Sequence, residues 1–220
     1  MIEISVSDEL KSSCPDFVGV ALIVKVQNTA HNESLWREIN AFSEELKSTL
    51  KISDVRHNKQ IAATREAYKA FGKDPNRYRP SAEALRRRIL RDMNLYQIDT
   101  LVDVVNLVSL KTGYSIGGFD FDKVKGNQLI LGVGQAEETF EAIGRGQLNI
   151  EGLPVYRDEV GGIGTPTSDE ERTKLDLETS TLMALINGYS GKEGLEEAVE
   201  YTKLLLDEYA SSEVLDSFYY

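Results

Sequence analysis

The stretch that organises the chain is residues 77–122, which read RYRPSAEALRRRILRDMNLYQIDTLVDVVNLVSLKTGYSIGGFDFD. Pro80 and Ser81 form a helix start signal, because proline fixes its own backbone angle and a serine hydroxyl can cap the free amides of a first turn. Glu83 in that turn complements the helix dipole. The sequence therefore predicts a helix whose apolar face is largely separate from its arginines. The apolar positions are Ala84, Leu85, Ile89 and Leu90, and the basic positions are Arg86, Arg87, Arg88 and Arg91.

A second, strongly apolar segment follows a polar break at residues 94–99. It reads LVDVVNLVSL over residues 101–110, and its Asp103 and Asn106 are three positions apart. On a helix, both polar side chains project from one face. Burying such a group without a partner costs about 1–3 kcal/mol. Two interpretations follow, a core cross-linked by these side chains or a ligand pocket, and the residues alone leave both open.

Composition favours one globular domain over the whole of residues 1–220. Hydrophobic residues make up 41% of the chain and charged residues 28%, which is ordinary for a soluble protein. No apolar run approaches the roughly 20 residues that cross a bilayer, and the first residues lack the pattern of a secretory signal. Cys14 is the only cysteine, which fits a reducing compartment. We therefore expect a cytoplasmic protein with no membrane partner.

The two histidines, His31 and His57, give no reason to expect a metal. Neither has a second histidine or a cysteine at metal-ligand spacing. No phosphate-binding glycine motif is complete in the chain either. We expect no metal and no cofactor.

The charge is unevenly distributed. The formal net charge is −11, whereas residues 56–91 hold eleven lysines and arginines against three acids, a local charge of +8. Nucleic-acid partners are generally met by basic surfaces, because much of their affinity comes from neutralising phosphates. The basic stretch is consistent with an RNA-binding patch, and equally with a solvated helical face that pairs with acids elsewhere in the fold.

The remaining elements follow from hydrophobic patterning. Residues 17–26 predict a buried strand, and Asn32 is placed to cap a helix that runs to Leu50. Residues 59–70 and 193–209 predict further helices, and residues 119–133 predict strands around a turn. Residues 175–186 fit a strand or a buried helix. For the tail after residue 209, a frayed end is the default expectation. Helices at the front and strands in the middle predict an α+β fold with mixed sheets and flanking helices.

The glycine-rich segment at residues 161–169 predicts a loop with several hydroxyl groups. Pro166 stiffens it, and its glycines allow backbone amides to approach a ligand closely. A tight loop whose Thr167 and Asp169 cap their own backbone accounts for the same residues. Both interpretations stay open.

One segment resembles a known family. The run VDVVNLVSLKTGYSIGGFD, residues 102–120, is similar without a gap to V-D-x-x-N-Y-V-x-x-x-x-G-Q-P-x-H-A-F-D of the tRNA-editing (B3/B4) domain of the phenylalanyl-tRNA synthetase beta subunit. Residues 79–85 resemble the opening of that domain in its stand-alone relatives, and residues 164–173 its late glycine-rich loop. The resemblance covers about residues 70–190. The strand and helices at 17–70 and the helix at 193–209 are then expected to pack around it.

The resemblance implies an RNA-binding, aminoacyl-tRNA-editing-like domain of translation. Such a domain binds an aminoacyl group or the aminoacylated end of a tRNA, with hydrolysis in trans as a further step; DNA is not an expected partner. The substrate-binding residues it implies are Asn106, Ser109, Gly117, Gly118, Asp120, Thr165, Thr167, Ser168, Asp169, Arg172 and Thr173. The RNA-binding residues it implies are Arg79, Arg86, Arg87, Arg88 and Arg91.

The sequence departs from the family pattern at one position that matters for chemistry. Gly117 stands where the family segment has a histidine, so no imidazole is available there to move a proton. The sequence therefore identifies no catalytic residue. The acidic net charge and the missing histidine favour an alternative, a non-catalytic binding protein for a free amino acid or similar metabolite. The arginine-rich helix favours RNA.

Overall fold

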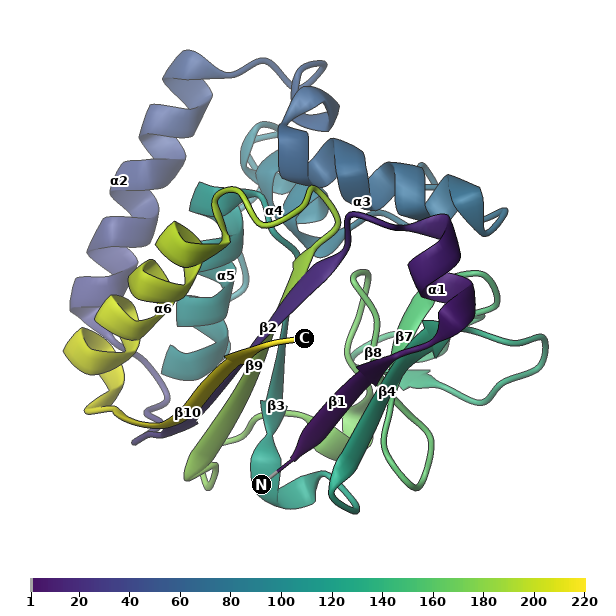
Figure 1. Cartoon of the computed structure of the whole chain (residues 1–220). Coiled ribbons are helices and arrows are strands. Elements are labelled where there is room, and N and C mark those ends of the chain that lie inside the picture. Colours follow the sequence, from purple (N-terminus) through teal and green to yellow (C-terminus); the bar gives the residue numbers. More distant parts are fainter. Residues whose placement is uncertain (1) are drawn as a thin grey trace.

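The computed structural model describes residues 2–220, which fold into three layers. Helices cover one face of a sheet with strand order β10-β2-β9-β3, and the other face packs on a second sheet with order β1-β4-β7-β8 (Figure 1). The helices are α1 (Asp8–Ser13), α2 (Glu33–Thr49), α3 (Lys59–Ala70), α4 (Ser81–Ile89), α5 (Thr100–Thr112) and α6 (Leu195–Ala210). The strands are β1 (Glu3–Val6), β2 (Val18–Lys25), β3 (Ile116–Asp120), β4 (Gln128–Val133), β5 (Glu141–Ala142), β6 (Gly146–Gln147), β7 (Pro154–Arg157), β8 (Gly162–Gly164), β9 (Thr181–Gly188) and β10 (Glu213–Tyr219).

The central strands β2 and β9 are apolar on both faces because each face meets a different layer. On β2, Val20, Leu22 and Val24 face the helices, whereas Ala21 and Ile23 face the second sheet. Strand β9 pairs with β2 along its whole length and with β3 on its other side, antiparallel in both cases. Residues 175–186, which fitted two elements by pattern, therefore contribute a strand.

Helix ends follow the capping residues of the sequence. Asn32 accepts hydrogen bonds from Ser34 N and Leu35 N at 3.1 Å and begins α2, as predicted. Asp99 caps α5 by accepting from Val102 N at 2.9 Å, and Gly113 ends α5 in the left-handed conformation at φ 85°. Helix α3 spans the predicted residues 59–70.

Helix α4 differs from the prediction in two ways. Pro80 occupies the cap position and Ser81 makes no side-chain capping bond, so the expectation that Ser81 caps the helix is wrong. Arg86 was expected on the polar side, but it is buried at 6% exposure. Its Nε donates to Leu110 O at 2.9 Å and its Nη2 to Lys111 O at 3.2 Å, because the last carbonyls of α5 lie under this part of α4.

The tail corrects another expectation. Residues 213–219 form β10, which pairs antiparallel with β2 and carries a register shift between Val214 and Asp216. The ring of Tyr220 lies against Gly19, where a Cβ atom would stand 2.3 Å from it. The Tyr220 hydroxyl is 2.7 Å from that of Tyr156. The tail is therefore an edge strand with an anchored last side chain, not a frayed end.

The architecture confirms the predicted α+β class. One pair of neighbouring strands, β1 and β4, is parallel, and the other pairs in the two main sheets are antiparallel. Within residues 2–220, no helix has the length and apolar character that crossing a bilayer requires.

Candidate functional site

A basic groove runs between α4, the loop that follows it, α5 and the loop at residues 165–169. We call it the arginine groove; its volume is about 360 Å³. Its lining residues are Arg79, Ser81, Ala84, Leu85, Arg87, Arg88, Arg91, Met93, Tyr96, Asn106, Arg145 and Thr167. Four of the five predicted RNA-binding arginines and two predicted substrate-binding residues thus share one cavity.

Most of the arginine charge in this groove is not neutralised by the protein. Arg87 Nε lies 2.7 Å from Glu83 Oε1, but within residues 2–220 no carboxylate lies within 4.0 Å of the guanidinium groups of Arg79, Arg88, Arg91 and Arg145. The Nε of Arg79 is buried and has no hydrogen-bond partner. A buried charged donor of this kind calls for an acceptor, and phosphate and carboxylate oxygens match the guanidinium fork.

Arg88 also positions an aromatic ring beside the groove. Its guanidinium lies 4.0 Å from the centre of the Tyr96 ring, and its Nε donates to Asn94 O at 2.6 Å. Tyr96 is 67% exposed, so its outer face is open to solvent. An exposed aromatic ring among free arginines is the combination on which unpaired nucleic-acid bases stack.

The buried Glu83 fixes the helix that carries these arginines. Its side chain is fully enclosed and receives Arg65 Nη1 at 2.8 Å on one oxygen and Arg87 Nε at 2.7 Å on the other. Together with the Arg86 contacts to α5, these bonds hold α4 at both ends of its inner face. The arginines on its outer face are therefore carried by a rigid element.

Some of the polar groups in the loop at residues 165–169 form hydrogen bonds with one another. Thr165 Oγ1 accepts from Thr167 N and Ser168 N at 3.2 and 3.1 Å and donates to Ser168 O, so it is occupied by the turn. Thr167 Oγ1 lies 2.9 Å from the Tyr68 hydroxyl and lines the groove. The loop is thus a tight turn, but Thr165 caps it and not Thr167 or Asp169 as that interpretation expected, and Thr167 faces the cavity.

Asp169 is the notable acid of this region. Gly118 N, at 3.4 Å from Oδ2, is the one hydrogen-bond partner that its carboxylate has within residues 2–220, and no lysine or arginine pairs with it. A Cβ atom on Gly117 would lie 3.5 Å from Asp169 Oδ1. The carboxylate therefore stands beside the position where the family pattern has its histidine. Burial raises the pKa of Asp169 to about 7.

Gly117 itself has no room for a side chain in this fold. The ring of the fully buried Phe119 lies 2.6 Å from the position of a Cβ atom on Gly117. A histidine there would have to displace this ring from the core between the two sheets. The departure from the family pattern is thus coupled to the packing of β3.

The other nine predicted substrate-binding residues do not line the groove; they are Ser109, Gly117, Gly118, Asp120, Thr165, Ser168, Asp169, Arg172 and Thr173. Asp120 accepts from Thr179 Oγ1 and Asp122 N and pairs with Lys123, which ties the end of β3 to the start of β9. Arg172 forms a two-pronged ion pair with Asp158 at 2.8 and 2.9 Å. Ser109 and Thr173 are buried. Their assignment to a ligand stays a prediction. Within residues 2–220, no group of three or more potential metal ligands comes together.

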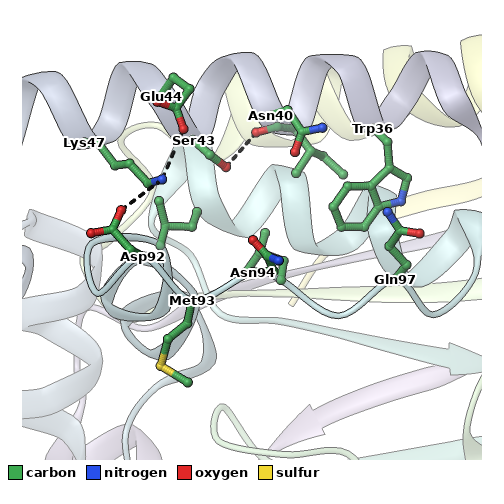
Figure 2. Close-up of a pocket in the computed structure, with 12 residues that line it drawn as sticks. Trp36, Asn40, Ser43, Glu44, Lys47, Asp92, Met93, Asn94 and Gln97 are labelled. Atoms are coloured by element: carbon green, nitrogen blue, oxygen red, sulfur yellow. Dashed lines mark hydrogen bonds and ion pairs between the residues drawn. The ribbon is translucent and has the colours of Figure 1, made fainter.

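A second cavity was not foreseen from the sequence. It has a volume of about 400 Å³ and lies between α2 and residues 92–97 (Figure 2). The sequence predicts only a polar break at residues 94–99, and Trp36, the only tryptophan of the chain, is a sequence signal for this cavity. Arg145 and Tyr96 were missed as well, because each lies in a loop without a recognisable pattern.

Comparisons with known proteins identify the family from the sequence and a similar fold from the structure. A family model described as the B3/4 domain matches residues 63–202. A solved structure described as an N-terminal fragment of the phenylalanyl-tRNA synthetase beta subunit from Pyrococcus horikoshii is similar over 97% of this chain, with 16% sequence identity and a TM-score of 0.52. This chain corresponds to 50% of that chain. No curated protein matches the sequence significantly.

Proposed function

Because the chain belongs to the B3/4 domain family, we propose that it binds the aminoacylated end of a tRNA and hydrolyses the ester that carries the amino acid. The observation that carries this proposal is the arginine groove. It places Arg79, Arg88, Arg91 and Arg145 without acidic partners around one cavity, in a chain whose net charge is −11. A patch of free guanidinium groups on an otherwise acidic protein favours a phosphate-bearing ligand at that place.

The chemistry would rest on Asp169. In the proposed step its carboxylate takes a proton from a water molecule, and the water oxygen attacks the carbonyl carbon of the aminoacyl ester. The bond from that carbon to the ribose oxygen breaks, and the proton passes to the departing ribose oxygen. A carboxyl group with a pKa of about 7 suits both transfers, because at neutral pH its protonated and deprotonated forms are both well populated.

The position of Asp169 supports this role over a structural one. The carboxylate lacks a cationic partner and has one long hydrogen bond from Gly118 N; it does not line the groove itself but lies two positions after Thr167, which does. Carboxylates that hold a fold together are normally paired more fully, as Asp158 is with Arg172. Asp169 is therefore the best candidate for a proton acceptor in place of the family histidine.

The test is deacylation of a panel of aminoacyl-tRNAs, which includes tyrosine on the phenylalanine tRNA, with filter binding on the same samples. We expect hydrolysis of a subset, with a rate that rises with pH through about 7 as Asp169 loses its proton. Asp169→Asn should lower this rate by about 10²–10⁴-fold and leave RNA retention unchanged. Asp122→Asn, which changes an exposed acid just after β3, serves as the matched control.

Each failure points to a different conclusion. Retention of RNA without hydrolysis of any aminoacyl-tRNA would remove the catalytic role and leave a tRNA-binding domain. Absence of both at low salt would overturn the proposal. The alternative, binding of a free amino acid or similar metabolite, would then become the leading function, since it requires neither RNA binding in the arginine groove nor ester hydrolysis.

A further inference from the structure

The second cavity, which we call the α2 cavity, presents uncommitted amide groups from two opposite walls. Asn40 projects from α2, and Asn94 and Gln97 project from the facing loop (Figure 2). None of these three side-chain amides has a hydrogen-bond partner among residues 2–220. Each offers donors and an acceptor, so the cavity is suited to a ligand with both kinds of group along its edges.

The charges in this cavity are already paired. At one end Lys47 Nζ lies 3.1 Å from Glu44 Oε1 and 3.2 Å from Asp92 Oδ1. The other end is closed by the indole of Trp36, whose Nε1 donates to Asp103 Oδ2 at 2.6 Å. Ile39, Ile89 and Leu95 add apolar lining, and the Ser43 hydroxyl of the lining donates to Ile39 O. Because Glu44 and Asp92 share one lysine, the cavity keeps a net charge of −1. Together with its apolar wall and free amides, this favours a flat ligand that has no negative charge of its own and carries hydrogen-bonding edges.

The α2 cavity and the arginine groove are neighbours across one loop. Met93 lines both of them, and in Figure 2 its side chain points away from α2. Arg88 of the groove holds the same loop through Asn94 O and stacks on Tyr96. A ligand that lies along the groove can therefore extend over the loop into the cavity.

From this arrangement we infer that the α2 cavity holds an unpaired base of the RNA whose phosphates lie in the arginine groove. A nucleobase is flat, uncharged and edged with donors and acceptors, and bases of unpaired RNA are commonly splayed into such pockets beside cationic surfaces. The inference rests on the proposed function, because it takes the groove as the phosphate site.

Trp36 provides a direct readout, since it is the only tryptophan in the chain and lines the cavity. The probes are a single-stranded RNA pentanucleotide and the same backbone without bases, titrated against the protein while the Trp36 fluorescence is recorded. Filter retention of both probes is measured in parallel. We expect both to be retained through their phosphates, but only the base-bearing probe to quench Trp36.

The matched variants separate the cavity from the groove. Asn40→Ala with Gln97→Ala removes two exposed amides. The affinity measured by Trp36 quenching should fall about tenfold, because each lost hydrogen bond lowers it roughly threefold or more. Gln147→Ala, an exposed amide outside the cavity, should leave it unchanged.

The outcomes distinguish this inference from the proposed function. Equal retention of both probes with no quenching by either would overturn the base pocket and leave the groove as the phosphate site. Quenching that the double variant does not weaken would also overturn it. Loss of retention of both probes would remove the proposed RNA site, and the inference with it.

Discussion

Asp103 is a carboxylate enclosed by the helical layer, at 1% exposure. It accepts the Trp36 indole at 2.6 Å and, more weakly, Ile98 N at 3.5 Å. Burial raises the pKa of Asp103 to about 6, although both hydrogen bonds act to lower it. The polar residues of the apolar segment thus divide between the two interpretations left open above: Asp103 cross-links the core, whereas Asn106 lines the arginine groove.

Asp103 makes the stability of the protein depend on pH. Its pKa is about 6 in the folded state against 3.8 for a free side chain, so between about pH 4 and pH 6 the folded state binds more protons. The free energy of unfolding therefore falls as the pH rises through this window, by about 2–3 kcal/mol from this group. Asp103→Asn keeps an acceptor for Trp36 and removes the ionisation. We expect the variant to exceed the parent protein in stability by about that amount at pH 8 and to match it near pH 4.

Urea unfolding of both proteins at several pH values measures this difference. Because other buried acids titrate in both proteins alike, the comparison isolates Asp103. A variant whose stability differs from that of the parent protein by the same amount at pH 4 and pH 8 would contradict this prediction, because it would show that Asp103 does not change its ionisation between these pH values.

Glu83 illustrates the opposite case, a buried acid that is fully paired. Its two oxygens bind Arg65 and Arg87, and its exposure is 0%. Glu83→Gln leaves two arginines facing a neutral group and should destabilise the protein by about 3–5 kcal/mol. Glu66→Gln breaks the exposed pair with Lys69 and should change stability by less than about 1 kcal/mol. Thermal or urea unfolding compares them, and similar losses in the two variants would contradict the role given to Glu83.

At the scale of elements, the end of α5 and the start of α3 meet at one glycine. Gly113 has a φ of 85°, and a Cβ atom there would lie 2.2 Å from Asn58 Oδ1. Asn58 in turn caps α3 by accepting from Ile61 N at 3.2 Å. A side chain at residue 113 would therefore disturb both helices at once.

Gly113→Ala should cost about 2–3 kcal/mol of stability, since it adds a left-handed alanine and displaces a helix cap. Asn58→Ala alone should cost about 1 kcal/mol. The double variant should lose less stability than the sum of the two single losses, because the clash with residue 113 disappears when the Asn58 side chain is removed. Strictly additive losses, measured by urea unfolding, would show that the two residues act independently.

Elements with a strong local pattern were predictable from the sequence, and elements that depend on distant partners were not. The helix at residues 59–70 and the strand at 17–26 are set by their own apolar spacing and caps. By contrast, β10 forms because it pairs with the free edge of β2, a strand near the other end of the chain. The acidic, aromatic sequence of β10 does not indicate this partner. Arg86 was misplaced for the same reason, since the carbonyls that bury it belong to α5.

At the scale of the whole molecule, the arginine groove is a local positive region on an acidic protein. Binding of single-stranded RNA should weaken with salt, with a slope of log affinity on log salt of about −0.7 for each phosphate contact. Arg79→Ala with Arg91→Ala should reduce that slope by about 0.7 per arginine. Filter binding over a range of salt concentrations measures it.

The control for that prediction changes the net charge equally. Arg56 and Arg77 are exposed arginines that do not line the groove, so Arg56→Ala with Arg77→Ala should leave the slope nearly unchanged. Equal effects of the two pairs would mean that RNA responds to overall charge and not to the groove.

The sequence predicted several residues of the candidate site but not how they are arranged in space. Asn106, Thr167, Arg87 and Arg88 were predicted as site residues, and the fold brings these four together, whereas Arg86 of the same helix is buried against α5. The sequence does not show which arginines lack a carboxylate partner, because ion pairs form between segments that are distant in the chain. The isolation of Asp169 likewise arises from the approach of β8 and β3, which pattern alone does not reveal.

The register shift in β10 has a consequence for how the protein behaves in concentrated solution. A regular, exposed edge strand invites pairing with the same strand of another molecule, and such pairing leads to aggregation. Here the edge is irregular between Val214 and Asp216, and the strand carries the acids Glu213 and Asp216. Two copies of this edge would meet with mismatched backbone groups and like charges. Val214 and Leu215 expose apolar side chains on this edge, but the edge itself disfavours the pairing of copies through which fibrils would grow.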